Sequence, residues 1–101
     1  MTPELKSHLS TISENFPSLK KKYFVKKIGI FGSTARGDHT TKSDVDILVE
    51  FYEPVGFFKF LELEDYLAKL LKKKVDLATK KALKKVIKKN ILKEVVYVEK
   101  R

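Results

Sequence analysis

Two aspartates, Asp44 and Asp46, are separated by a single residue at the head of an apolar run that ends at Phe51. On a β-strand, side chains two positions apart share a face, so both carboxylates would project together, about 7 Å apart along the strand. Two like charges at the start of a core strand cost free energy unless an opposite charge compensates them. Carboxylate oxygens are ligands that suit Mg²⁺. The pair therefore predicts a divalent-metal site.

A third acid, Asp76, lies between Val75 and Leu77 in a second short apolar run. Burying an unpaired charge costs free energy, so an acid in the middle of such a run is expected to have a compensating partner or a functional role. A helix predicted over residues 57–71 would connect the two runs, and a strand–helix–strand unit commonly brings its two strands close in one sheet. All three carboxylates could then meet at one site. Two-metal phosphoryl or nucleotidyl transfer uses such a set of acids.

A glycine–serine pair, Gly32 and Ser33, ends the apolar run that precedes these acids. We expect a short helix over residues 33–37 whose backbone N–H groups point back at the strand end, an arrangement that cradles an anion. Arg36 is one of only two arginines among 22 basic residues. Its planar guanidinium group can bind phosphate through two N–H donors. The alternative role for Arg36 is a structural salt bridge.

The elements that must position these residues follow from the spacing of apolar side chains. We expect helices over residues 3–16 and 57–71, a further helix capped by Thr79, and strands over residues 25–31, 44–51, 75–78 and 95–98. Pro17 would end the first helix, and the lysines at 20–22 would form a solvated turn. The predicted fold class is α/β (α+β), a small mixed β-sheet with helices packed on it.

The two later helices carry apolar faces of different kinds. In the helix over 57–71 a broad stripe is interrupted by Glu64, which predicts either a well-buried helix or one that also meets a partner. The stripe comprises Phe57, Phe60, Leu61, Leu67, Ala68 and Leu71, and it is widened by Leu63, Tyr66 and Leu70. In the helix after Thr79 we expect an inner stripe and an outer face of lysines, most simply a solvated face. That inner stripe comprises Ala82, Leu83, Val86, Ile87 and Asn90.

Composition narrows the class of protein. The chain has 101 residues, of which 43% are hydrophobic, so we expect one globular domain over residues 1–101. There is no cysteine and no apolar run of about 18 residues, which predicts no disulfide, no thiolate metal site and no membrane span, and we expect a cytoplasmic protein. The net charge of +9 favours nucleotides, nucleic acid or an acidic protein as partner.

The run from Gly32 to Asp46 resembles a known signature. It reads G-S-T-A-R-G-D-H-T-T-K-S-D-V-D, which matches the pattern G-S-x-A-R-G-x(6)-D-x-D. This pattern is similar to that of the minimal nucleotidyltransferases, or MNT domains, of the nucleotidyltransferase superfamily related to DNA polymerase beta. Asp76 matches the third carboxylate of the family. The resemblance spans residues 25–98 and implies the nucleotidyltransferase fold.

The resemblance implies a role for each acid. Asp44 and Asp46 would hold the metals of a two-metal Mg²⁺ site. Asp76 would bind the catalytic metal and help to deprotonate an acceptor hydroxyl. The hydroxyl would attack the α-phosphorus of a nucleoside triphosphate in line, and pyrophosphate would leave.

The same resemblance assigns the nucleotide-binding residues. Gly32 and Ser33 would contact the β- and γ-phosphates of ATP, and Arg36 would pair with the triphosphate. Lys42 is a weaker candidate for that pairing. No residue that would read the base can be named.

The resemblance also implies a partner. It leaves little of the chain for an acceptor-binding domain, so we expect the acceptor on another molecule. Standalone MNT domains resemble the antitoxins that transfer AMP to a tyrosine of a HEPN-type ribonuclease toxin encoded next to them. One alternative is a non-catalytic antitoxin that occludes the toxin. Another is a nucleic-acid binder that uses the lysines of residues 80–89, which is not favoured because aromatic residues for base stacking are missing there.

Overall fold

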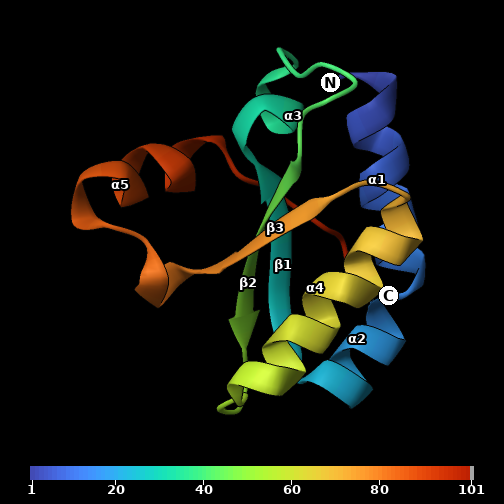
Figure 1. Ribbon diagram of the computed structural model, residues 1–101, viewed down its shortest axis with the longest axis vertical. Helices are drawn as coiled ribbons and strands as arrows, with labels where there is room; N and C mark the ends of the chain where they lie inside the picture. Colours follow the sequence, from blue (N-terminus) through green and yellow to red (C-terminus); the bar gives the residue numbers. More distant parts are fainter. Residues whose placement is uncertain (101) are drawn as a thin grey trace.

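Four strands form one mixed sheet, in the spatial order β3-β2-β1-β4 (Figure 1). In the computed structural model, which describes residues 1–100, the strands are Val25–Phe31 (β1), Val45–Phe51 (β2), Val75–Thr79 (β3) and Val96–Tyr97 (β4). β1 is antiparallel to both β2 and β4, whereas β2 and β3 are parallel. The predicted fold class is confirmed.

The helices lie on both sides of this sheet. They are α1 (Pro3–Glu14), α2 (Phe16–Tyr23), α3 (Gly32–Arg36), α4 (Phe57–Leu71) and α5 (Lys85–Glu94), with a 3₁₀ turn at Lys80–Ala82. Figure 1 shows α1, α2 and α4 gathered on one side of the sheet and α5 on the other, near α3. Within residues 1–100, no helix has the length and apolarity that crossing a membrane requires.

Alternation along β2 separates the core from the acids. Val45, Ile47 and Val49 are at most 1% exposed and belong to the main hydrophobic core, which includes side chains of α1, α2 and α4. Asp46 therefore lies on the opposite face, as the period of two predicts. On β1 the alternation is broken by a register shift between Val25 and Lys27, so both Val25 and Ile28 reach the core.

Helix α4 makes the crossover between the parallel strands β2 and β3. It buries Leu63, Leu67 and Leu71, which are spaced four residues apart. Glu64 does not weaken this packing, because its carboxylate accepts the backbone N–H of Leu77 on β3 at 2.9 Å. The predicted stripe contained all three of these leucines, but it was too broad, because it also contained Phe57 and Leu61, which are 69% and 39% exposed.

The N-terminal region corrects one prediction. Pro17 does not end a helix but stands in the first turn of α2, where proline is tolerated because its missing N–H has no helical partner there. Asn15 separates α1 from α2, and its carbonyl accepts the N–H of Leu19. The lysines at 20–22 are consequently helical, although their side chains are exposed as expected.

The predicted helix after Thr79 is also corrected. The Thr79 side chain caps the 3₁₀ turn by accepting the N–H of Ala82 at 3.2 Å, and α5 begins only at Lys85. Val86 and Ile87, expected on the inner stripe, are 86% and 47% exposed, while Ile91 is the buried residue of α5. The cause is the placement of α5, which lies against α3 and away from the main core.

A pair of truncations tests which face of each helix carries stability. Leu67→Ala removes a fully buried side chain of α4, so we expect the free energy of unfolding to fall by about 2–5 kcal/mol. Val86→Ala truncates a side chain that is 86% exposed, and it should change stability by less than about 0.5 kcal/mol. Urea denaturation followed by circular dichroism measures both. Comparable losses in the two variants would contradict the orientation of α5.

Candidate active site

Asp46 and Asp76 are direct neighbours across the parallel pair β2 and β3. Their Cα atoms are register partners, between the pairs Val45–Val75 and Ile47–Leu77. The core-facing residues on either side fix the two acids on the opposite face of the sheet. Asp46 is half-buried and Asp76 is exposed. The predicted meeting of these two acids through the strand–helix–strand unit is thus confirmed.

The charges around Asp46 disfavour its ionised form. Burial has the largest effect and raises the pKa of the Asp46 carboxyl above its ordinary value. Repulsion by Asp76 and then by Asp44 raises the pKa further, and attraction by Arg36 opposes them. A cation held between these carboxylates would relieve the repulsion and favour the ionised form.

Asp44 stands just before β2, which begins one residue later than predicted. It is half-buried and close enough to Asp46 to repel it. In residues 1–100, no three acidic or histidine side chains are already arranged to hold a metal ion. The structure therefore brings Asp46 and Asp76 together with Asp44 nearby, and this set of oxygen donors fits Mg²⁺ in its chemistry.

Gly32 makes the turn from β1 into α3 close against Asp46. Its φ angle is +73°, a conformation that residues with a Cβ rarely adopt, and an added Cβ would overlap the Asp46 carboxylate. The short helix predicted after the turn is confirmed, and it begins at Gly32 itself. Glycine is thus required here both by backbone conformation and by space.

Arg36 lies between two carboxylates. Its Nε donates to Asp38 at 3.2 Å, and its Nη1 donates to the two oxygens of Glu94 at 3.2 and 3.3 Å. Hydrogen bonds to Asp38 and then to Glu94 raise the pKa of the guanidinium. The salt-bridge alternative for Arg36 is therefore present in the structure. The side chain is still 50% exposed, so contact with an anion is not excluded by burial.

Glu94 is a site residue that the sequence did not reveal. Besides its contact with Arg36, it accepts the backbone N–H of Gly32 at 2.9 Å. It is the last residue of α5 and lies 62 positions from Gly32 along the chain. The available signal was that Glu94 is the only acid in the lysine-rich stretch of residues 80–94.

The remaining predicted residues lie in α3 and the loop that follows it. The Ser33 carbonyl accepts the N–H groups of Gly37 and Asp38, which closes the end of α3. Lys42 is exposed in a turn over residues 40–43 and forms no ion pair within the part of the chain that the structure describes. The structure does not bring Lys42 into contact with Gly32 or Arg36.

His39 attaches this loop to α1. Its Nε2 pairs with the Glu4 carboxylate, which also contacts His8 at 3.3 Å and Lys73 at 3.3 Å. His8, itself a residue of α1, is buried. The loop that leads to Asp44 is thus held to the N-terminus of the chain and to the segment before β3.

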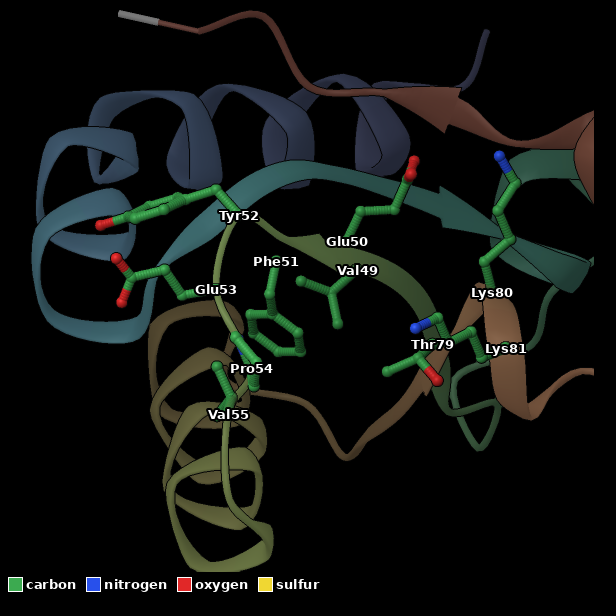
Figure 2. A pocket seen from close by; sticks show the side chains of 10 residues that line it. All are labelled: Val49, Glu50, Phe51, Tyr52, Glu53, Pro54, Val55, Thr79, Lys80 and Lys81. Carbon is green, nitrogen blue, oxygen red and sulfur yellow. The ribbon is translucent and has the colours of Figure 1, made fainter.

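A cavity of about 420 Å³ lies elsewhere, at the ends of β2 and β3 away from the acids. Figure 2 shows Phe51 and Val49 between Pro54 and Val55 on one side and Thr79 on the other. None of the predicted site residues lines this cavity. The acids instead lie on the sheet face opposite the main core, where Asp76 is exposed and Asp46 is half-buried.

Comparison with known proteins agrees with this arrangement. Residues 9–98 match the family model of the nucleotidyltransferase domain. A relative from Methanocaldococcus jannaschii, named "putative protein adenylyltransferase", is 59% identical over 81 residues, which are 79% of this chain and 83% of the relative. Protein adenylyltransferase MntA from Thermococcus cleftensis is 47% identical over 89 residues, 88% of this chain and 90% of that protein.

Solved structures show the same fold. A "putative minimal nucleotidyltransferase" matches with a TM-score of 0.75 and 29% identity, covering 91% of this chain and 93% of that one. An MNT antitoxin in complex with a tri-AMPylated HEPN toxin of Shewanella oneidensis matches with a TM-score of 0.60 and 19% identity, covering 97% and 71% of the two chains. The chain therefore belongs to the nucleotidyltransferase domain family.

Proposed function

We propose that this protein is a Mg²⁺-dependent protein adenylyltransferase that acts as a cytoplasmic antitoxin. It would transfer AMP from ATP to a hydroxyl, on a tyrosine side chain, of a partner HEPN-type toxin encoded next to it. The observation that carries this proposal is the pairing of Asp46 with Asp76 across β2 and β3, with Gly32 packed against Asp46. These residues place an acidic pair directly beside a close backbone turn.

The proposed roles follow the geometry. Asp44, Asp46 and Asp76 would hold Mg²⁺, which supplies charge neutralisation for the triphosphate during transfer. Asp76 is exposed at the sheet surface, where it would accept the proton of the tyrosine hydroxyl. The tyrosine oxygen forms a bond to the α-phosphorus, the bond from that phosphorus to the bridging oxygen breaks, and pyrophosphate leaves.

The nucleotide would lie along the turn after β1. Gly32 provides the close approach of the backbone, although its own N–H is already bonded to Glu94. Ser33 would contact the β- and γ-phosphates, and Arg36 would pair with the triphosphate through its exposed side. Lys42, two residues before Asp44 and exposed, would add a weaker contact.

Names of similar proteins support the choice of acceptor. The relative from Thermococcus cleftensis is named a protein adenylyltransferase, and the Shewanella oneidensis neighbour is an MNT antitoxin bound to an AMPylated HEPN toxin. The exposure of Asp76 at the sheet surface also suits a macromolecular acceptor.

The direct test is a transfer assay. Incubating the protein with α-labelled ATP, MgCl₂ and the product of the adjacent gene should place label on that product, and EDTA should abolish the transfer. Mass spectrometry of the labelled product should locate AMP on a tyrosine. Binding of AMP-PNP, measured by calorimetry, confirms that the protein used is competent. A protein that binds nucleotide but transfers no label would refute the proposed activity.

A non-catalytic antitoxin is the second candidate, and one surface favours it. Tyr52, Phe57, Phe58 and Leu61 are 45%, 69%, 80% and 39% exposed, all in or just before the first half of α4. Exposed apolar groups of this size mark surfaces that bind proteins. If occlusion alone neutralises the toxin, a variant with Asp44→Asn and Asp46→Asn will neutralise it fully at a stoichiometric dose.

A further inference from the structure

One carboxylate connects two separate parts of the nucleotide site. Glu94 Oε1 accepts both the Gly32 backbone N–H at 2.9 Å and Arg36 Nη1 at 3.2 Å, and its Oε2 contacts the same Nη1 at 3.3 Å. The Glu94 side chain is 25% exposed, so these contacts are partly shielded from water. Hydrogen bonds between charged groups are stronger when shielded in this way.

The backbone of Glu94 is itself held in place by the sheet. Val95 follows Glu94 directly, and β4 begins at Val96. β4 pairs with β1 through Val96 opposite Ile30 and Tyr97 opposite Gly29. Glu94 therefore lies at the C-terminal end of α5, two residues before a strand that is hydrogen-bonded to β1 near the Gly32 turn. Its position does not depend on the exposed lysine face of α5.

The two carboxylates around Arg36 accept hydrogen bonds from two of its three guanidinium nitrogens. Nε donates to Asp38 and Nη1 donates to Glu94, whereas Nη2 has no hydrogen-bond partner within residues 1–100. A guanidinium held at two of its nitrogens has a fixed plane. The free Nη2 amine, on a side chain that is half exposed, can then donate to an anion without first being ordered.

We propose that Glu94 is a positioning residue for the triphosphate of the nucleotide, acting through Arg36. This assignment rests on the proposed function, because it presumes that Arg36 binds the triphosphate. Glu94 orders the guanidinium before the nucleotide arrives, so binding does not have to restrict the arginine side chain. Restricting such a side chain on binding weakens affinity.

A role of Glu94 that weakens nucleotide binding would also have a clear physical basis. A carboxylate that occupies the Gly32 N–H and the Arg36 guanidinium competes with phosphate for the same donors and repels its charge. Removing the Glu94 charge would then strengthen nucleotide binding. The two roles predict changes of opposite sign, so a single affinity measurement separates them.

The test compares Glu94→Gln with Glu62→Gln, using AMP-PNP and MgCl₂ in titration calorimetry. Both substitutions remove one negative charge, but Glu62 is exposed on α4 and has no side-chain hydrogen bond within residues 1–100. We expect Glu94→Gln to weaken binding about 3- to 10-fold and Glu62→Gln to leave it unchanged. In an Arg36→Ala background, Glu94→Gln should have no further effect, because its role passes through Arg36.

Each outcome decides the assignment. Tighter or unchanged binding by Glu94→Gln overturns it, as does the same loss of affinity in the presence and absence of Arg36. A merely structural role would lower the melting temperature and leave the affinity of the folded protein unchanged. If the wild-type protein fails to bind AMP-PNP, the proposed function fails; if it binds and Glu94→Gln binds equally, only the role of Glu94 fails.

Discussion

Replacing Asp46 with asparagine is expected to slow AMP transfer roughly 100- to 1,000-fold while leaving the protein at least as stable as wild type. The loss of rate follows from removing a metal ligand at the centre of the acidic pair. Stability should not fall, because the half-buried carboxylate is repelled by Asp76 and Asp44 and its ionised form is disfavoured. Asparagine has nearly the same shape and no charge, so the repulsion disappears.

Two measurements check this result, namely initial rates of label transfer and thermal denaturation with and without MgCl₂. Because a ligand that binds only the folded state stabilises it, Mg²⁺ should raise the melting temperature of the wild type but not of Asp46→Asn. Asp65→Asn is the matched control, since Asp65 is exposed on α4 and, within residues 1–100, its one ion pair is with Lys69. Undiminished transfer by Asp46→Asn would refute its role as a metal ligand.

Replacing Gly32 with alanine should damage both the fold and the site. A residue with a Cβ at φ +73° costs about 1–3 kcal/mol of folding free energy. For a domain of this size, each kcal/mol lowers the melting temperature by about 4–8 °C. The added Cβ would also push the Asp46 carboxylate aside, and a displacement of about 1 Å at a catalytic group can lower the rate about 100-fold.

Gly56→Ala is the matched control for this substitution. Gly56 has an ordinary φ of −69° at the start of α4, and within residues 1–100 no atom beyond its own chain neighbours lies within 4 Å of where its Cβ would be. Gly56 is the N-cap of α4, where alanine is less favourable than glycine, so we expect a loss of at most about 1 kcal/mol and no change in transfer rate. Melting curves and transfer rates of the two variants should separate clearly. An alanine variant of Gly32 with wild-type rate and stability would show that the turn is not constrained by Asp46.

The sequence predicts those parts of the structure that depend on neighbouring residues. Val25–Phe31 and Phe57–Leu71 have the predicted bounds, and the period of two along β2 correctly places Asp46 opposite the core. The meeting of Asp46 with Asp76 was also predictable, because a parallel crossover through one helix limits where the second strand can lie.

The features that could not be predicted from the sequence depend on contacts between segments that are distant in the chain. The spacing of the apolar residues of α5 fits an inner stripe. Which of these residues is buried, however, depends on where the helix packs, and Ile91 is the one that is buried. Pro17 is compatible with the end of one helix or the first turn of the next, and the burial of Leu19 decides for the latter. The sequence marks Glu94 only as the single acid of residues 80–94, and nothing near it in the sequence indicates its contacts with Gly32 and Arg36.

The position of Glu64 limits how other chains can attach to this protein. Its carboxylate occupies the Leu77 N–H on β3, which is one edge strand of the sheet, and the other edge strand, β4, has only two residues. A foreign strand that tried to extend the sheet would find few free backbone groups at either edge. Both features disfavour edge-to-edge pairing with the sheet of another molecule.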